Sequence, residues 1–123
     1  MGRRGEDLAA EHLSRLGFRT LARNVRTRAG EIDLIAFDGR TLVFAEVKTR
    51  RVLSSDGRVR AHQEPLAWLR PRQRARVRRL ALAWLSDARA ERPSAPVLRF
   101  DAVGVILDGQ DRLLRLDHLE DAW

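Results

Sequence analysis

Three side chains that can do chemistry stand close together in two short apolar segments. Asp33 lies in the segment Gly30–Phe37, and Glu46 and Lys48 lie in the segment Thr41–Thr49. Two carboxylates beside apolar side chains repel each other, and a hard divalent cation such as Mg²⁺ relieves the repulsion by accepting carboxylate oxygens together with water or phosphate oxygens. A nearby ammonium could orient a water molecule or offset developing negative charge. The pattern predicts phosphodiester hydrolysis, and the alternative is a surface ion pair between Lys48 and either acid.

The elements that must position these groups are two neighbouring strands. Both segments are rich in branched and aromatic residues, and they flank Asp38-Gly39, a strong hairpin signal. Because side chains alternate between faces, a two-residue turn would make Glu46 the diagonal neighbour of Asp33 on one face. A four-residue loop would place the two acids directly opposite each other. A three-residue loop without a bulge would separate them, so two of the three registers bring the acids together.

The other elements follow from apolar periodicity and turn residues. Residues 5–16 have the spacing of an amphipathic helix, and Pro71 fits the first turn of a long helix that we expect to reach about residue 90. Strands are predicted at 18–25, 97–107 and 112–116, with a loop at 51–64. The order is α-β-β-β-α-β plus a last strand, with the third and fourth strands parallel because a helix joins them. We expect one α/β domain over residues 1–123, a mixed sheet flanked by helices.

The positive charge is concentrated in one segment. Residues 50–79 hold ten arginines against Asp56 and Glu64, whereas the whole chain has a net charge of +7. A compact basic segment favours a polyanion, and nucleic acid is the obvious one; the alternative is a solvated charged face. All but one of the 24 cationic side chains are arginine, and the exception is Lys48. The candidate phosphate-binding residues are Arg50, Arg51, Arg58, Arg60, Arg72, Arg76 and Arg79.

Composition excludes several other classes of protein. The absence of cysteine excludes disulfide frameworks, thiolate metal sites and cysteine nucleophiles. The longest apolar run, 80–85, is too short to span a membrane, and the N-terminal residues show no secretory signal. His12, His62 and His118 are scattered and show no metal-ligand spacing. We therefore expect a cytoplasmic protein with neither a membrane partner nor a nucleotide cofactor.

Two strings in the chain carry a family resemblance. The segments 30–36 (GEIDLIA) and 43–50 (VFAEVKTR) resemble the YraN-like family of small bacterial proteins, and the likeness extends to Gly5-Glu6, Asn24, 99–101 and His118. That family is grouped with the PD-(D/E)XK nucleases and is similar to archaeal Holliday-junction resolvases. The resemblance implies a restriction-endonuclease-like αβββαβ core and Mg²⁺- or Mn²⁺-dependent cleavage of DNA, with branched or damaged DNA as the expected substrate. Since resolvases of this type usually work as dimers, it also implies a homodimer.

The resemblance also assigns roles to individual residues. Asp33 and Glu46 would be metal ligands with the Val47 carbonyl as a third, and Lys48 would be the catalytic cation. Glu6 would match an acid that some resolvases add from a helix; its alternative is a first-turn acid favoured by the helix dipole. Gln73 would match a glutamine that reaches the site in related nucleases, although the family pattern has a lysine near this position.

Two other interpretations remain open from the sequence. The chain could be a nucleic-acid-binding module that keeps the fold without chemistry, in which case its affinity falls steeply with salt and the acids bind no metal. It could also be a subunit whose activity requires a partner.

Overall fold

Five strands form one mixed sheet with the spatial order β1-β2-β3-β4-β5. The computed structural model describes residues 2–67, 71–87 and 94–122, and for residues 2 and 71–74 it describes the backbone alone. The strands are β1 (Arg19–Thr27), β2 (Gly30–Phe37), β3 (Thr41–Arg51), β4 (Val97–Leu107) and β5 (Leu113–Leu119), and the helices are α1 (Gly2–Arg15), the one-turn η1 (Ala61–Gln63) and α2 (Pro71–Leu85).

The predicted hairpin of β2 with β3 and the predicted parallel pairing of β3 with β4 are both confirmed. The first three strands form an antiparallel meander, β3 and β4 are parallel, and β5 returns antiparallel to β4. The expected α/β class with a mixed sheet and flanking helices is therefore confirmed, and the arrangement is compatible with a restriction-endonuclease-like core.

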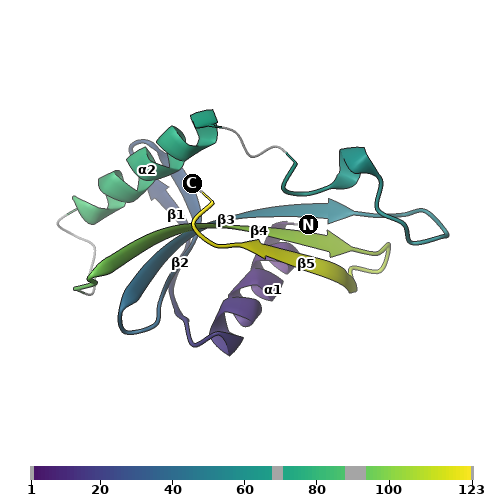
Figure 1. Ribbon diagram of the computed structural model, residues 1–123, viewed down its shortest axis with the longest axis horizontal. Coiled ribbons are helices and arrows are strands. Elements are labelled where there is room, and N and C mark those ends of the chain that lie inside the picture. Colours follow the sequence, from purple (N-terminus) through teal and green to yellow (C-terminus); the bar gives the residue numbers. More distant parts are fainter. Residues whose placement is uncertain (1, 68–70, 88–93, 123) are drawn as a thin grey trace.

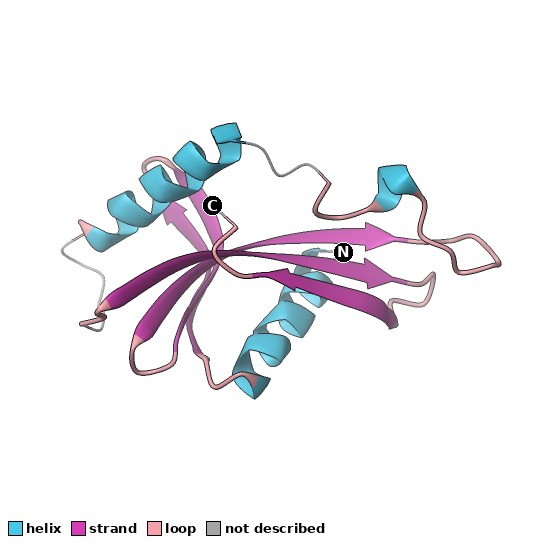
Figure 2. Ribbon diagram, viewed as in Figure 1, coloured by secondary structure: helices cyan, strands magenta, loops and turns pink. Residues whose placement is uncertain are grey.

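The two long helices cover opposite faces of the sheet (Figure 1). Helix α1 buries Leu8, Ala9 and Leu13 against one apolar cluster, and α2 buries Val77, Leu80, Ala81 and Trp84 against another. Figure 2 shows the same layering, with the loop that follows β3 extending past the end of that strand, on the side away from α2. Each helix presents one apolar stripe to the sheet, so the alternating side chains of the central strands separate into two cores.

The helix on the first face lies very close to β3. A Cβ atom added at Gly5 would overlap the Thr49 hydroxyl, so glycine lets α1 pack directly against the Thr49 side chain. At its other end α1 stops where Gly17 adopts φ 97°, a left-handed conformation that glycine enters at little cost. Gly5 allows α1 to lie close to β3, and Gly17 ends the helix. Together they determine where α1 places Glu6.

The element boundaries differ from the predicted ones at several ends: α1 begins at Gly2 instead of residue 5, and β3 runs to Arg51 instead of Thr49. Strand β1 runs two residues further, to Thr27, and β5 runs to Leu119. The predicted extension of α2 to about residue 90 is wrong over its described part, because the helix ends at Leu85. Just beyond that end the Ser86 hydroxyl donates to the Ala83 carbonyl, a local hydrogen bond that competes with continued helix.

Within the described residues, none of the helices is both long enough and apolar enough to cross a membrane.

Candidate functional site

The hairpin between β2 and β3 uses the longest of the three predicted loops. Phe37 pairs with Leu42, and Leu34 pairs with Ala45, so four residues form the connection. The Asp38 carboxylate accepts the backbone N–H groups of Arg40 and Thr41 at 2.9 and 2.6 Å, which closes the loop. Continued by one residue, this register places Asp33 opposite Glu46, which is the arrangement predicted for a four-residue loop.

Asp33 lies in an unfavourable place for a carboxylate. Its Oδ2 accepts the Val47 N–H at 2.8 Å. Burial raises the pKa of Asp33 to about 6, and although the Val47 hydrogen bond opposes this, the negative charges of Glu46, Glu6 and Glu31 raise it further. An acid surrounded by acids is costly to ionise, so the arrangement favours a cation or a proton at this position.

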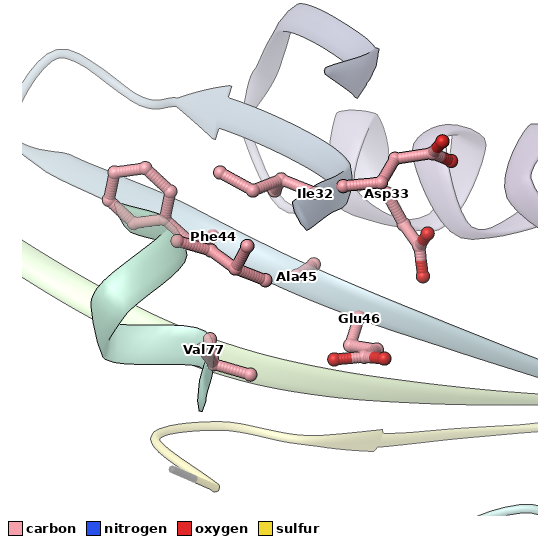
Figure 3. A pocket seen from close by; sticks show the side chains of 8 residues that line it. Ile32, Asp33, Phe44, Ala45, Glu46 and Val77 are labelled. Carbon is pink, nitrogen blue, oxygen red and sulfur yellow. The ribbon is translucent and has the colours of Figure 1, made fainter. Parts of the chain in front are cut away.

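Asp33 and Glu46 line one pocket between β2, β3 and α2. Its other lining residues are Glu31, Ile32, Phe44, Ala45, Val77 and Leu80. Figure 3 shows the Asp33 and Glu46 carboxylates at one end of the pocket, with Ile32, Phe44 and Val77 at the other. The apolar end limits access of water to the two carboxylates, which strengthens any electrostatic interaction they make.

Glu46 is paired within the chain. Arg76 Nη1 on α2 lies 3.2 Å from Glu46 Oε1 and 3.3 Å from Oε2. Lys48 follows two residues later on β3, is half-buried, and stands beside Gly104 in the parallel register. Residues 44 and 46 face α2, so alternation places Lys48 on that face too.

Glu6 reaches the same region from α1. Its carboxylate accepts Asn24 Nδ2 at 2.9 Å, and Arg23 Nη2 lies 3.9 Å from the same oxygen. The Glu6 charge acts on Asp33, and so does the charge of Glu46. The charges of Glu6 and Glu46 thus both act on Asp33, and the three acids come from three different elements: α1, β2 and β3.

The donor set is suited to a hard divalent cation. Within the described residues, no three His, Asp or Glu side chains form a complete metal-ligand group. Mg²⁺ does not require one, because it commonly takes one or two carboxylates and keeps water or phosphate oxygens. The half-buried Asp33 carboxylate, whose pKa is raised by burial and by neighbouring acids, meets that requirement together with Glu46 across the pocket, once Glu46 exchanges Arg76 for the cation.

The predicted phosphate-binding arginines have different surroundings. Arg51 pairs with Asp111, and Arg60 pairs with Asp56 at 3.0 Å. Arg58 and Arg79 are exposed, and Arg50 is half-buried beside the Thr49 carbonyl. The basic segment is therefore partly neutralised by acids of its own chain. The side chains of Arg72 and Gln73 lie outside the described residues, so both remain sequence predictions.

The sequence did not predict a network of hydrogen-bonded side chains that lies on the opposite face of the sheet. His12 Nε2 lies 3.0 Å from His118 Nδ1, and His118 Nε2 lies 2.7 Å from Asp101 Oδ2. Asp101 is fully buried and also accepts two bonds from Arg99 at 2.9 Å. The two histidines are 106 residues apart, so no local pattern could have paired them. Asp101 makes structural hydrogen bonds and lies on the α1 face of the sheet rather than in the pocket.

The sequence is similar to proteins of several bacteria. A family model described as uncharacterised protein family UPF0102 matches residues 5–105. A UPF0102 protein of Acidothermus cellulolyticus is 44% identical over 118 residues, which cover 90% of this chain and 84% of the relative. One of Streptomyces griseus is 47% identical over 107 residues, covering 87% and 82%. One of Geobacter sulfurreducens is 38% identical over 123 residues, covering 100% and 88%.

Proposed function

The chain belongs to the uncharacterised protein family UPF0102, and we propose that it is a metal-dependent nuclease that hydrolyses phosphodiester bonds in DNA. The sheet order and the helices on both faces support this proposal, because they are compatible with a restriction-endonuclease-like core. Fold alone does not specify chemistry, so the proposal depends on the site.

One observation carries the proposal. Asp33 is half-buried, and its pKa is raised to about 6 by that burial and by the charges of Glu46, Glu6 and Glu31, in a pocket that Glu46 also lines. Such a cluster lowers the stability of the fold unless a cation compensates it, and perturbed carboxylates of this kind are found preferentially at functional sites.

The proposed roles follow from position. Asp33 and Glu46 would hold Mg²⁺ or Mn²⁺ with the Val47 carbonyl, and Glu6 would add a fourth oxygen donor from α1. When bound, the cation supplies Lewis-acid activation of water and charge neutralisation at a phosphate. Lys48, on the same face of β3 as Glu46, would hold the attacking water and offset negative charge that develops on the phosphate.

The test is a cleavage assay with matched variants. Linear, nicked, flapped and four-way DNA is incubated with the full chain and Mg²⁺ or Mn²⁺ at fixed salt. We expect cleavage of at least one substrate, lost in Asp33→Ala and Glu46→Gln and retained in Glu11→Gln, which removes an exposed α1 acid that pairs with Arg15. Cleavage that persists in Asp33→Ala removes the assignment.

A second candidate is a DNA-binding module without chemistry. The contact between Arg76 and Glu46 favours it, because a guanidinium already compensates the Glu46 charge. This candidate predicts DNA binding that weakens steeply with salt, and no calorimetric heat from Mn²⁺. Mn²⁺ binding that Glu46→Gln abolishes would decide for the nuclease.

A further inference from the structure

Asn24 has an unusual backbone conformation in the middle of a strand. Its φ is 51°, in the left-handed region that residues other than glycine seldom occupy and that asparagine tolerates best. In the register of β1 and β2 it stands between the pairs Arg23–Leu34 and Val25–Ile32, which places it opposite Asp33. Strained residues of this kind persist only where their surroundings hold them, often at functional sites.

In both β1 and β2, the alternation of side chains between the two faces of the sheet is interrupted at this position. Ile32 and Ile35 pack in the same core cluster beneath α2, and Ala22 and Val25 pack against that cluster as well. In a regular strand, residues three apart face opposite sides of the sheet. The interruption therefore falls at the Asn24–Asp33 position, and it leaves Asp33 directed at the Val47 N–H on β3 instead of at either core.

The side chain of Asn24 acts on the third acid. Its amide donates to Glu6 Oε1 at 2.9 Å, and the Glu6 side chain is 14% exposed. Since Asn24 stands opposite Asp33 in the register of β1 and β2, this hydrogen bond holds the Glu6 carboxylate on the side of the sheet edge where Asp33 lies, against the repulsion between the two acids. An amide donor fixes the direction of the carboxylate without adding positive charge, whereas the Arg23 guanidinium, 3.9 Å from the same oxygen, pairs more closely with Asp7, at 2.7 Å.

We propose that Asn24 is a positioning residue that holds the Glu6 carboxylate beside Asp33, so that α1 supplies an oxygen donor to the divalent cation. This inference rests on the proposed function. Two properties are required at once, a left-handed backbone and a side-chain N–H donor. Glycine has only the first and glutamine is suited only to the second, so asparagine is the residue that combines them.

The test measures Mn²⁺ binding by calorimetry on the full chain. Asn24→Gly keeps the backbone conformation and removes the amide, and we expect it to weaken Mn²⁺ binding about tenfold, as loss of a partner of a metal ligand commonly does. Glu6→Gln should weaken binding at least as much. The double variant should be no worse than Glu6→Gln alone, because both changes act through one carboxylate.

A matched control is available at the far end of the chain. Asp121 also has a left-handed backbone, with φ 52°, and its backbone N–H donates to the Asp101 carboxylate at 3.0 Å. Asp121→Gly should leave Mn²⁺ affinity within twofold of the wild type. The melting temperature of every variant in chelator shows that each is folded.

The outcomes separate the two proposals. If Asn24→Gly binds Mn²⁺ as tightly as the wild type, or if its effect adds in full to that of Glu6→Gln, the positioning role is wrong. If the variant weakens binding as expected but the wild type cleaves none of the DNA substrates, the positioning role stands and the nuclease proposal falls. If the wild type binds no Mn²⁺, both fall.

Discussion

The Arg76 guanidinium on α2 donates to both carboxylate oxygens of Glu46 on β3, at 3.2 and 3.3 Å. The pair joins the helix to the strand at the pocket where Asp33 also lies. The Arg76 side chain is 42% exposed and that of Glu46 is 23% exposed, so water screens their attraction considerably. A divalent cation with two charges could therefore displace a guanidinium with one.

The first prediction concerns this competition. Arg76→Ala should bind Mn²⁺ about three- to tenfold more tightly, because Glu46 no longer has to leave an internal cation, while unfolding free energy changes by less than about 1 kcal/mol. Arg79→Ala is the control, since Arg79 is an exposed arginine on the same helix. Calorimetry measures both variants. Weaker Mn²⁺ binding in Arg76→Ala than in Arg79→Ala would contradict the competition.

The second prediction concerns the cost of ionising Asp33. In chelator at pH 8, Asp33→Asn should be more stable than the wild type by about 1–3 kcal/mol, because the native state raises this pKa to about 6 from an ordinary 3.8. The amide oxygen of asparagine can still accept the Val47 N–H. Urea denaturation at several pH values measures the difference.

The pH dependence of that difference has a definite sign. Between pH 3.8 and about 6 the native state holds the Asp33 proton more firmly than the unfolded chain does, so the wild type gains stability as the pH falls. The advantage of Asp33→Asn should therefore shrink through this window. Asp38→Asn is the control of opposite sign, because backbone N–H groups of Thr41 and Arg40 lower the Asp38 pKa and its loss should destabilise the protein at pH 8. An advantage of Asp33→Asn that is constant with pH would contradict the explanation.

Much of the fold could be predicted because its signals are local. The strand bounds 30–37 and 97–107 are as predicted, since turn residues limit both segments and their apolar side chains are continuous. The parallel pairing of β3 and β4 followed from the helix between them. Two of the three possible hairpin registers predicted Asp33 near Glu46. The structure has the register with a four-residue loop, which the hydrogen bonds to the Asp38 carboxylate stabilise.

The rest depends on contacts that periodicity does not encode. Strict alternation of side chains along β2 predicts Asp33 and Ile35 on one face and Ile32 on the other. In the structure Ile32 and Ile35 pack in the same cluster, because the alternation is interrupted opposite the left-handed Asn24. Likewise the contact between His12 and His118 forms only when α1 packs on the sheet beside β5. Both features require the tertiary structure, because neither partner reveals the other from its sequence neighbours.

The third prediction concerns the buried acid on the other face. Burial raises the pKa of Asp101, but hydrogen bonds from His118, Arg99 and the Asp121 N–H outweigh it and hold the pKa below its usual value. Asp101→Asn should cost about 3–5 kcal/mol, because it removes the charge that compensates the Arg99 guanidinium, whose side chain is only 20% exposed. Chemical denaturation at pH 7 measures the loss.

The control and the pH dependence of this variant are also defined. Asp117→Asn removes an acid from the more exposed pair with Arg115 and should cost less than about 1 kcal/mol. Because the folded pKa of Asp101 is depressed, its contribution is present above pH 3.8 and is lost as the pH falls through the lower folded value. Equal losses in Asp101→Asn and Asp117→Asn would contradict the buried charge as the cause.

The fourth prediction concerns the attachment of the basic loop to the sheet. A Cβ atom at Gly104 on β4 would lie 2.6 Å from Pro65 Cγ and 3.1 Å from Leu66 Cγ, so the loop after β3 rests directly on the strand. Gly104→Ala should destabilise the protein by about 1–3 kcal/mol, since the packed proline has to move. It should also weaken DNA binding at low salt, because the same loop carries Arg58 and Arg60.

Two further variants test this cause. Gly109→Ala places its Cβ 3.4 Å from Leu53 Cδ2, an ordinary contact, and should leave both stability and DNA affinity near the wild type. Pro65→Ala in the Gly104→Ala background removes the Cγ atom that would be struck and should recover part of the lost stability. Denaturation and fluorescence anisotropy with labelled duplex DNA measure the two effects. If DNA affinity in Gly104→Ala is unchanged although stability falls, the loop position does not contribute to DNA binding, and the basic footprint must lie on α2 instead.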